Sequence, residues 1–327
     1  MYLVTGGAGF IGSNVAAALA ERGEQVVVCD RLRSSEKWRN LAKVGLAELV
    51  TPAELSEWLP AHAAAIDAVV HMAAVSATTA RDADLVVAVN LRLAQTLWRW
   101  CAAAGKRFLY ASSAATYGDG AQGFDDEASS AALARLRPLN VYAWSKQLFD
   151  RWVARTLEEG GPRPPQWVGL KFFNVYGPNE YHKAAMQSVV AQKYALAATT
   201  GTVTLFRSHR ADVADGAQRR DFVYVRDCVA VILWLLQHPQ VSGLFNVGTG
   251  QARSFAEVAH ILCATLERPG RLQYVDMPPG VRAHYQYFTE ARLQRLRQAG
   301  YSAPFTALEE GIRDYVRCYL SQPDPYR

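Results

Sequence analysis

The sequence predicts an α/β fold, in which a doubly wound parallel sheet is combined with a second, smaller α/β domain. Short apolar runs alternate with helical patterns through the first half of the chain. A glycine-rich turn joins the first apolar run to the first helical pattern, and the second half alternates less regularly. We therefore expect one domain over residues 1–173 and a smaller one over residues 174–327.

The individual elements follow from hydrophobic periodicity. Buried parallel strands are predicted at 25–29, 68–71, 108–111 and 167–173, and a helix at 85–104. In the second half, the patterns predict helices at 184–198, 226–237 and 254–266, and an extended segment at 202–206. Segments within 222–250, such as residues 244–247, are expected to return to the first sheet.

The glycine-rich turn is the first chemical signal. Gly6, Gly9 and Gly12 stand three residues apart between an apolar strand and a helix. This spacing is typical of the Rossmann dinucleotide-binding turn, in which backbone N–H groups at the helix start hold a pyrophosphate. The next strand ends at Asp30, about 20 residues on, where an acidic residue usually binds a ribose hydroxyl.

Composition narrows the class of protein. The 327 residues carry 35 basic and 30 acidic side chains, and the apolar runs are too short to span a membrane. Because Met1 leads directly into the first strand, we expect no signal peptide and a cytoplasmic location. The five cysteines are scattered and lack metal-ligand spacing. We expect no metal site, no membrane partner and no nucleic-acid partner.

Tyr142 and Lys146 form the second chemical signal. Residues four apart lie on one face of a helix, so the lysine ammonium can stabilise the tyrosine phenolate. A tyrosine with a lowered pKa can exchange a proton with a sugar hydroxyl near neutral pH. The pair in isolation is compatible with an ordinary surface contact, but together with the cofactor turn it indicates catalysis.

A serine precedes this pair at the end of a predicted strand. Ser113 lies four residues before Tyr117 in the stretch SSAATYG, and FNVYGP follows at 173–178. With the glycine turn and the Tyr142–Lys146 pair, these motifs resemble the extended short-chain dehydrogenase/reductase superfamily. The resemblance implies a catalytic triad of Ser113, Tyr142 and Lys146. Dehydratases of that superfamily carry two acidic residues after the serine, whereas this chain has Ala114 and Ala115, which disfavours dehydration.

The stretch NVYGPNEYHK at 174–183 is similar to the family of ADP-L-glycero-D-manno-heptose 6-epimerases. Segments at 109–118, 138–142, 220–225 and 245–250 share the resemblance, which runs almost to the C-terminus. It implies epimerisation at C6 of ADP-D-glycero-β-D-manno-heptose, a step toward the inner core of lipopolysaccharide. It also implies a homo-oligomer, with a pentamer among the options.

Two bases are expected for this reaction, because the two C6 alcohol configurations place their oxygen in different positions. Tyr142 would serve one configuration and Lys183 the other, if desolvation beside Lys146 lowers the pKa of Lys183. A lysine that only binds phosphate is the competing interpretation of Lys183.

Two features of the sequence favour different cofactors. Asp30 alone favours NAD, but Arg31, Arg33, Lys37 and Arg39 crowd the same segment. The resemblance implies NADP, with Lys37 at a position that the family uses, and NAD remains the alternative. The expected cofactor contacts are Gly6, Gly9, Phe10, Ile11, Gly12, Asp30, Arg31, Lys37, Met72, Ala73, Ala74, Val75, Ser76, Asn90, Tyr142, Lys146 and Val175.

For the nucleotide sugar, Arg220 is the strongest candidate, because a guanidinium pairs well with pyrophosphate oxygens. The chain departs from the family at Ala185 and Gln192 and carries a longer loop at 207–219. The expected substrate contacts are Ser76, Asn174, Lys183, Ala185, Gln192, Phe206, Arg220 and Tyr285.

Two other functions remain open at this point. The chain could be a 4-epimerase or a reductase that acts on another nucleotide sugar. It could also be a catalytically silent NADP-binding sensor, although the intact Ser113, Tyr142 and Lys146 argue against a pure binding role.

Overall fold

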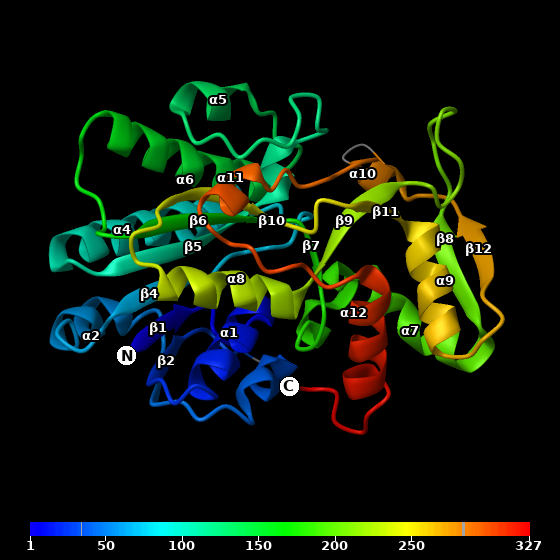
Figure 1. Cartoon of the computed structure of the whole chain (residues 1–327), viewed down its shortest axis with the longest axis horizontal. Helices are drawn as coiled ribbons and strands as arrows, with labels where there is room; N and C mark the ends of the chain where they lie inside the picture. Colours follow the sequence, from blue (N-terminus) through cyan, green and yellow to red (C-terminus); the bar gives the residue numbers. More distant parts are fainter. Residues whose placement is uncertain (34, 283–284) are drawn as a thin grey trace.

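The computed structural model describes residues 1–33, 35–282 and 285–327. Within these residues, a seven-stranded sheet fills one end of the molecule, and smaller sheets lie at the other end (Figure 1). Within the seven-stranded sheet, all neighbouring strands are parallel to each other. The order across this large sheet is β10 (Gly243–Val247), β6 (Trp167–Phe172), β5 (Arg107–Ser113), β4 (Ala68–His71), β1 (Tyr2–Thr5), β2 (Val26–Cys29) and β3 (Glu48–Val50).

Helices cover both faces of the large sheet (Figure 1). On one face α1 (Phe10–Ala20) and α8 (Val225–Gln237) pack together, with Val15 and Ile232 in the core. On the other face lie α2 (Leu55–Ala61), α4 (Leu93–Ala104) and α6 (Val141–Glu158), whose core side chains include Trp98 and Phe149. Burial on both faces explains why the strand segments read as continuous apolar runs.

The opposite end of the molecule has its own core, which contains Leu205, Leu262 and Ile312. Here β9 (Arg219–Tyr224) lies between β7 (Asn174–Tyr176) and β11 (Ala252–Ser254), while β8 (Thr202–Phe206) pairs with β12 (Arg271–Val275). The helices are α7 (Val189–Thr200), α9 (Phe255–Thr265) and α12 (Leu308–Tyr315). Ser254 and Glu257 form a reciprocal capping box that fixes the start of α9.

The remaining elements are short. They are η1 (Glu36–Leu41), α3 (Ala83–Val87), η2 (Ala88–Arg92), η3 (Ala114–Tyr117), α5 (Ser130–Arg135), η4 (Tyr181–Met186), α10 (Pro279–Arg282), α11 (Gln294–Gln298) and η5 (Val316–Leu320). The turn η2 is a π-helix that interrupts the predicted helix at 85–104, between α3 and α4.

The structure confirms the predicted α/β class and the four predicted strands of the large sheet. Residues 243–247 return to that sheet as β10, which pairs with β6. The division at residue 173 stays a prediction, because α8 and β10 of the second half pack within the first.

One predicted helix is wrong at its start. The pattern placed a helix at 184–198, but Ala184 has a φ of 46°, which interrupts any helix there. The helix α7 begins at Val189, where the Ser188 side chain accepts a hydrogen bond from the Ala191 N–H.

No helix in the described ranges is long and apolar enough to cross a membrane. Trp98 is fully buried inside the chain, where it packs against Phe108 and Trp152. It therefore cannot contact another subunit, whereas Trp144 is 42% exposed.

Candidate active site

The candidate site lies where the parallel strands of the large sheet end. Strands β1, β4 and β5 are neighbours and end at Thr5, His71 and Ser113. Because parallel strands end at the same edge, the glycine turn after β1, the loop after β4 and the serine of β5 meet there. This edge is where doubly wound sheets bind ligands.

The glycine turn has the close packing that a dinucleotide requires. Gly6 has a φ of 67°, and a Cβ added there would lie 2.5 Å from the Ala73 backbone nitrogen. At Gly12, a Cβ would lie 2.2 Å from the Gly6 carbonyl oxygen. Gly9 precedes α1, whose start has neither a side-chain cap nor an acidic residue in its first turn. The open N–H groups of this helix therefore suit a pyrophosphate, and the turn fits a dinucleotide cofactor.

Asp30 follows β2 and is held by three donors. Its carboxylate accepts hydrogen bonds from the Ala8 N–H (2.9 Å), the Arg31 N–H (2.7 Å) and the Lys37 ammonium (2.5 Å). Lys37, which we expect to contact the cofactor, therefore pairs directly with Asp30, the acidic residue that favours NAD. This pairing reduces the negative charge that a ribose 2′-phosphate would meet.

The loop after β4 forms the next part of the expected cofactor site. The Val75 N–H donates to Oδ1 of Asn90 over 2.8 Å, and Nδ2 of Asn90 donates to the Val75 carbonyl over 3.1 Å. Nδ2 also donates to Ser145 on α6 over 2.9 Å. Asn90 therefore joins the loop to the helix of the Tyr–Lys pair. The loop residues Met72, Ala73, Ala74 and Val75 are half-buried, and Ser76 is exposed.

Ser113 lies close enough to Tyr142 for the serine hydroxyl to act on the tyrosine phenol. Ser113 ends β5, and Tyr142 lies in the first turn of α6, which the Asn140 side chain caps. The pKa of the Tyr142 phenol is raised above its usual value, which is opposite to the lowered pKa expected from the sequence. Burial raises it most, the hydrogen bond with Ser113 lowers it, and the nearby Asp150 carboxylate raises it. The serine thus favours the ionised form of the tyrosine.

Lys146 lies one turn after Tyr142 and is 4% exposed. Its ammonium donates to the Ala111 carbonyl of β5 over 2.8 Å. Burial lowers the pKa of Lys146 to about 8, against the opposing effect of Asp150. Burial also lowers the pKa of the neighbouring His71 to about 3, with a further contribution from the charge of Lys146, so this histidine is neutral at pH 7.

Lys183 lies in the short helix η4, and its ammonium is 5.1 Å from the centre of the Phe10 ring. Phe10 begins α1, so Lys183 lies beside the glycine turn. Burial lowers the pKa of Lys183, as predicted, but the neighbouring charge that acts on it is that of Glu180, which raises the pKa. We had expected Lys146 to be the neighbour that depresses this pKa, and the structure does not place Lys146 in that role.

Glu180 holds the segment that carries Lys183. Its carboxylate accepts hydrogen bonds from the Gly177 N–H (3.3 Å), from the Ser188 hydroxyl (2.7 Å) and from the Ser188 N–H. These contacts tie both ends of the segment to one fully buried side chain. At its far end, the exposed Gln192 donates to the Ala185 carbonyl over 3.0 Å, which brings the two positions that depart from the family pattern together.

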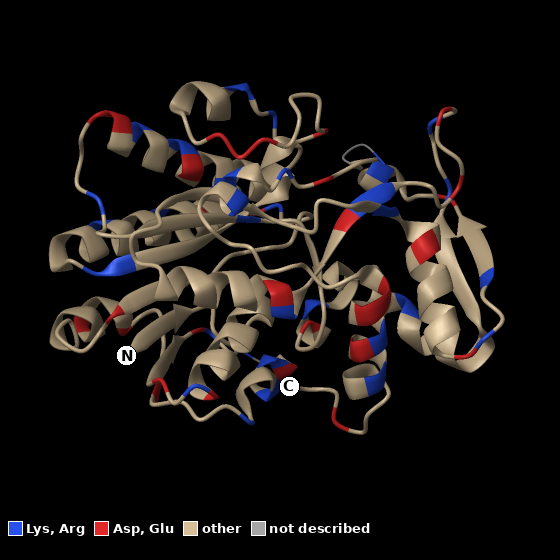
Figure 2. Ribbon diagram, in the orientation of Figure 1, with Lys and Arg blue, Asp and Glu red and all other residues tan. Residues whose placement is uncertain are grey.

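The structure also brings Arg220 and Tyr285 together. The Arg220 guanidinium lies 5.0 Å from the centre of the Tyr285 ring and 5.7 Å from that of Phe255. It is 5% exposed and donates to the backbone carbonyls of Arg219 and Gln286. Basic residues are concentrated along β9 and α10 in this part of the molecule (Figure 2). Phe206, at the end of β8, is 36% exposed.

Asn174 and Val175 connect the two ends of the molecule. They lie in β7, which follows β6 of the large sheet and pairs with β9 beside Arg220. Asn174 is exposed, and its Oδ1 accepts from the Thr289 hydroxyl at 3.5 Å. Its position between the two groups of residues is the one expected for a substrate contact.

Sequence reasoning missed several buried charged groups around the site. Asp221 accepts hydrogen bonds from the backbone of Thr249, Gly250 and Ala291, and so fixes the segments beside β9. Asp150 and Lys171 form a fully buried ion pair. A lysine inside the apolar run of β6 is the signal that could have indicated this pair.

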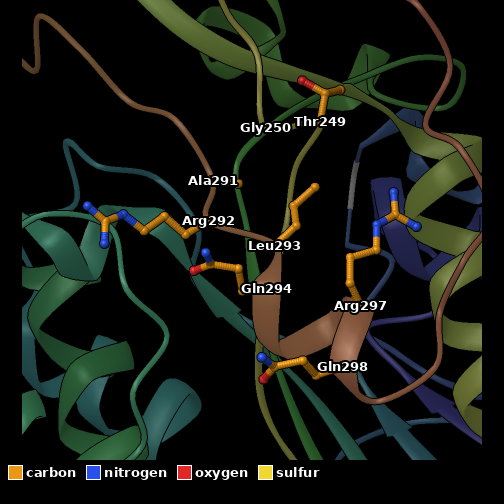
Figure 3. Close-up of a pocket in the computed structure, with 8 residues that line it drawn as sticks. All are labelled: Thr249, Gly250, Ala291, Arg292, Leu293, Gln294, Arg297 and Gln298. Carbon is orange, nitrogen blue, oxygen red and sulfur yellow. The ribbon is translucent and has the colours of Figure 1, made fainter.

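The described residues contain no group of three or more side chains that could bind a metal ion. A cavity of about 580 Å³ lies at another place, beside α11 (Figure 3). None of the predicted site residues is in its lining, which consists of Thr249, Gly250, Ala291, Arg292, Leu293, Gln294, Arg297 and Gln298.

Comparisons with known proteins show the family of this chain. Residues 2–248 match the model of the NAD dependent epimerase/dehydratase family. The ADP-L-glycero-D-manno-heptose-6-epimerase of Nitratidesulfovibrio vulgaris (strain DP4) is 49% identical over 100% of both chains. The protein of the same name from Fusobacterium nucleatum is 42% identical, again over 100% of both.

A solved structure gives the same result. The Helicobacter pylori ADP-L-glycero-D-manno-heptose-6-epimerase aligns with a TM-score of 0.78 and 32% identity, over 96% of this chain and 94% of that one. The chain therefore belongs to the NAD dependent epimerase/dehydratase family and, within it, to the ADP-L-glycero-D-manno-heptose-6-epimerases.

Proposed function

We propose that this enzyme converts ADP-D-glycero-β-D-manno-heptose to its L-glycero epimer by inverting the configuration at C6. The observation that carries the proposal is the contact of Ser113 with Tyr142, one turn before a buried Lys146, in a chain that matches heptose epimerases over its full length. A binding protein without activity has no need for these three groups in this arrangement.

Tyr142 would remove the proton from the C6 hydroxyl in one configuration of the sugar. A bound nicotinamide would supply the redox chemistry, taking a hydride from C6 and returning it to the opposite face. Ser113 stabilises the phenolate by its hydrogen bond, and Lys146 contributes a positive charge one turn away. The planar ketone has to rotate within the site before it is reduced.

Lys183 would hold and return the proton in the other configuration. Its lowered pKa suits a group that alternates between ammonium and amine, and Glu180 keeps a share of the ammonium form. The same lysine also lies beside the glycine turn, where a phosphate is expected, so a role as a phosphate anchor is the outcome that the variants below are designed to detect.

NADP is the cofactor that we propose. Lys37 pairs with Asp30 over 2.5 Å, which leaves Arg31 and the adjacent loop to meet a 2′-phosphate. Gly6, Gly9 and Gly12 would hold the pyrophosphate through the backbone, while Asn90 fixes the loop that follows β4. We propose the remaining cofactor contacts as they are predicted from the sequence.

Arg220 and Tyr285 would bind the ADP part of the substrate. A buried guanidinium beside an aromatic ring offers charge for the pyrophosphate and a flat surface for the adenine. Phe206 and Asn174 flank this region from β8 and β7. We also propose the division of the chain near residue 173, a homo-oligomeric assembly and a cytoplasmic location.

The test is turnover of purified enzyme with ADP-D-glycero-β-D-manno-heptose, with product configuration assigned by NMR. We expect the L-glycero epimer, and no product from UDP-galactose or UDP-glucose. A 4-epimerised UDP-sugar, or net formation of reduced cofactor, would instead identify a 4-epimerase or a dehydrogenase. Absence of turnover with every sugar, while NADP binds tightly, would identify a silent sensor.

A further inference from the structure

We propose that the buried pair formed by Asp150 and Lys171 acts as a positioning pair for Tyr142 and Lys146. In this pair, the Asp150 carboxylate supplies a negative charge that opposes the positive charge of Lys146 and favours the protonated form of Tyr142. This inference rests on the proposed function, because it assigns a role in that reaction to two residues outside the triad. It is carried by the placement of the carboxylate, its partners and its complete burial.

The placement follows from the spacing along α6. Tyr142, Lys146 and Asp150 stand four residues apart, so all three lie on the same face of the helix. Asp150 is one turn beyond Lys146 and two turns beyond Tyr142. The Asp150 carboxylate therefore lies on the same face of the helix as Tyr142 and Lys146.

The carboxylate of Asp150 fastens this helix to the strand that carries Ser113. It accepts hydrogen bonds from the Ser112 hydroxyl at 2.6 Å and the Tyr110 phenol at 3.2 Å, both on β5. Ser112 immediately precedes Ser113. The contact thus fixes the position of α6 along β5, and therefore the distance between Tyr142 and Ser113.

Lys171 completes the pair from the neighbouring strand β6. Its ammonium lies 3.3 Å from Asp150 and donates to the Thr116 hydroxyl at 2.6 Å. It also lies 4.6 Å from the centre of the Tyr117 ring. Lys171 is opposite Ser112 in the β5–β6 register, so the ion pair joins α6, β5 and β6 at one level.

Both side chains are 0% exposed. Removing two opposite charges from water costs free energy that their attraction seldom exceeds, and apolar side chains of similar size would stabilise such a position at least as well. Stability alone therefore does not account for the pair. An electrostatic role beside the triad does.

The titratable groups around Asp150 come from every element that packs against it. They are Lys146 on α6, Lys171 on β6 and Tyr110 on β5, with Tyr117 and Asp126 further along the same buried network. Asp150 raises the pKa of both Lys146 and Tyr142. It therefore favours the charged form of Lys146 and the protonated form of Tyr142.

The consequence is that Tyr142 can act both as base and as acid. A base in one half of the reaction has to return the proton in the other half, which requires a pKa near the working pH. The hydrogen bond with Ser113 lowers the pKa of Tyr142, whereas burial and the charge of Asp150 raise it, so Asp150 favours the protonated tyrosine that returns the proton.

The test compares Asp150→Asn and the double variant Asp150→Asn/Lys171→Met with the wild-type holoenzyme. The double variant leaves no unpaired charge in the interior and keeps the fold available if the single variant is unstable. We expect the acidic limb of the kcat/KM profile to move to lower pH by about one unit in Asp150→Asn. The double variant should shift it in the same direction but by less, because it also removes the positive charge of Lys171. Asp150→Glu, which keeps the charge, should stay close to the wild type.

A matched control separates charge from destabilisation. Gln147 is also buried on α6 and donates to the Leu133 and Leu136 carbonyls, away from the triad. Gln147→Met should lower the melting temperature without moving the pH midpoint. If Asp150→Asn and the double variant also lose only stability and keep the wild-type midpoint, the pair is structural and the proposal is overturned.

A second readout does not depend on the substrate. Tyrosine labelled with ¹³C at Cζ reports phenol ionisation by NMR, and Tyr142→Phe identifies the resonance of Tyr142. We expect this resonance to titrate at lower pH in both Asp150 variants, even if the sugar specificity proves to be different. An unchanged titration of Tyr142 would overturn the inference while leaving the proposed function standing.

Discussion

Lys146 donates a hydrogen bond from its ammonium to the backbone carbonyl of Ala111, over 2.8 Å. This contact binds helix α6 to strand β5 two residues before Ser113. Tyr142 lies one turn earlier on the same helix, so the serine, the tyrosine and the lysine are held by one helix–strand junction. Five variants test how this junction and its surroundings work.

Tyr142→Phe should lower kcat by a factor of about 10² to 10⁴, the range that a positioned general acid/base contributes. Phenylalanine keeps the ring but removes the group that exchanges the proton. The cofactor should stay bound, which mass spectrometry of the released dinucleotide can establish. Trp144→Phe on the exposed side of the same helix is the control and should keep wild-type kcat.

Lys183→Met should abolish net epimerisation while one half-reaction persists, because Tyr142 still serves one configuration. Partial reduction of the cofactor by a single epimer, followed by absorbance, would reveal that half-reaction. Lys193→Met on α7 is the matched control. A raised KM with kcat nearly unchanged would make Lys183 a phosphate anchor and leave Tyr142 as the base for both configurations.

Lys37→Glu should weaken NADP far more than NAD, since it places a second carboxylate beside Asp30 where Lys37 now pairs over 2.5 Å. Calorimetric titration of both cofactors measures the difference. Lys43→Glu, whose ammonium contacts Asp324 instead, should change neither affinity. Equal losses of the two cofactors would place Lys37 away from the 2′-phosphate.

Arg220→Lys should raise KM for the nucleotide sugar by about tenfold to a hundredfold, with a smaller change in kcat, because one ammonium replaces a two-pronged donor. Steady-state kinetics with the ADP-sugar give both constants. Arg268→Lys, on the exposed surface, serves as control. A fall in kcat at constant KM would instead show that Arg220 acts on the reacting centre.

Lys146 gives a pH dependence of stability with a defined sign. Burial lowers its pKa to about 8 in the folded chain, from 10.5. Between these values the unfolded chain binds more protons at this residue, so the contribution of Lys146 to folding stability rises with pH and is least favourable at pH 7.

Lys146→Met removes this penalty. In urea titrations we expect the variant to gain stability relative to the wild type at pH 7, by an amount that shrinks by on the order of 3 kcal/mol as the pH approaches 10.5. A difference between wild type and variant that stays constant from pH 7 to 10.5 would contradict the lowered pKa.

Much of the large sheet could be predicted because most of its strands are buried on both faces and read as apolar runs, as Ala68–His71 does. Two members of the triad were predictable for a similar reason. Tyr142 and Lys146 stand four residues apart on one helix, so local geometry places them on one face. Ser113 was assigned by the resemblance to the superfamily, because its approach to Tyr142 depends on the packing of α6 against β5.

The rest depended on contacts between distant segments. The 184–198 pattern looked helical throughout, but the Glu180 contacts and the positive φ of Ala184 delay the helix to Val189. The link between Asp30 and Lys37 is local, whereas that between Asp150 and Lys171 needs the pairing of β5 with β6, which no spacing along the chain reveals. The prediction that Lys146 is the charged neighbour that affects the pKa of Lys183 was wrong for the same reason, because that neighbour is Glu180.

The most direct test of the proposed reaction is the fate of the C6 hydrogen. The measurement is NMR and mass analysis of product formed from substrate carrying deuterium at C6, in ordinary water. Oxidation and re-reduction within one site predict that the L-glycero product keeps its deuterium at C6. Replacement of that deuterium by solvent hydrogen would contradict the account, because it would mean that C6 loses a proton instead of a hydride.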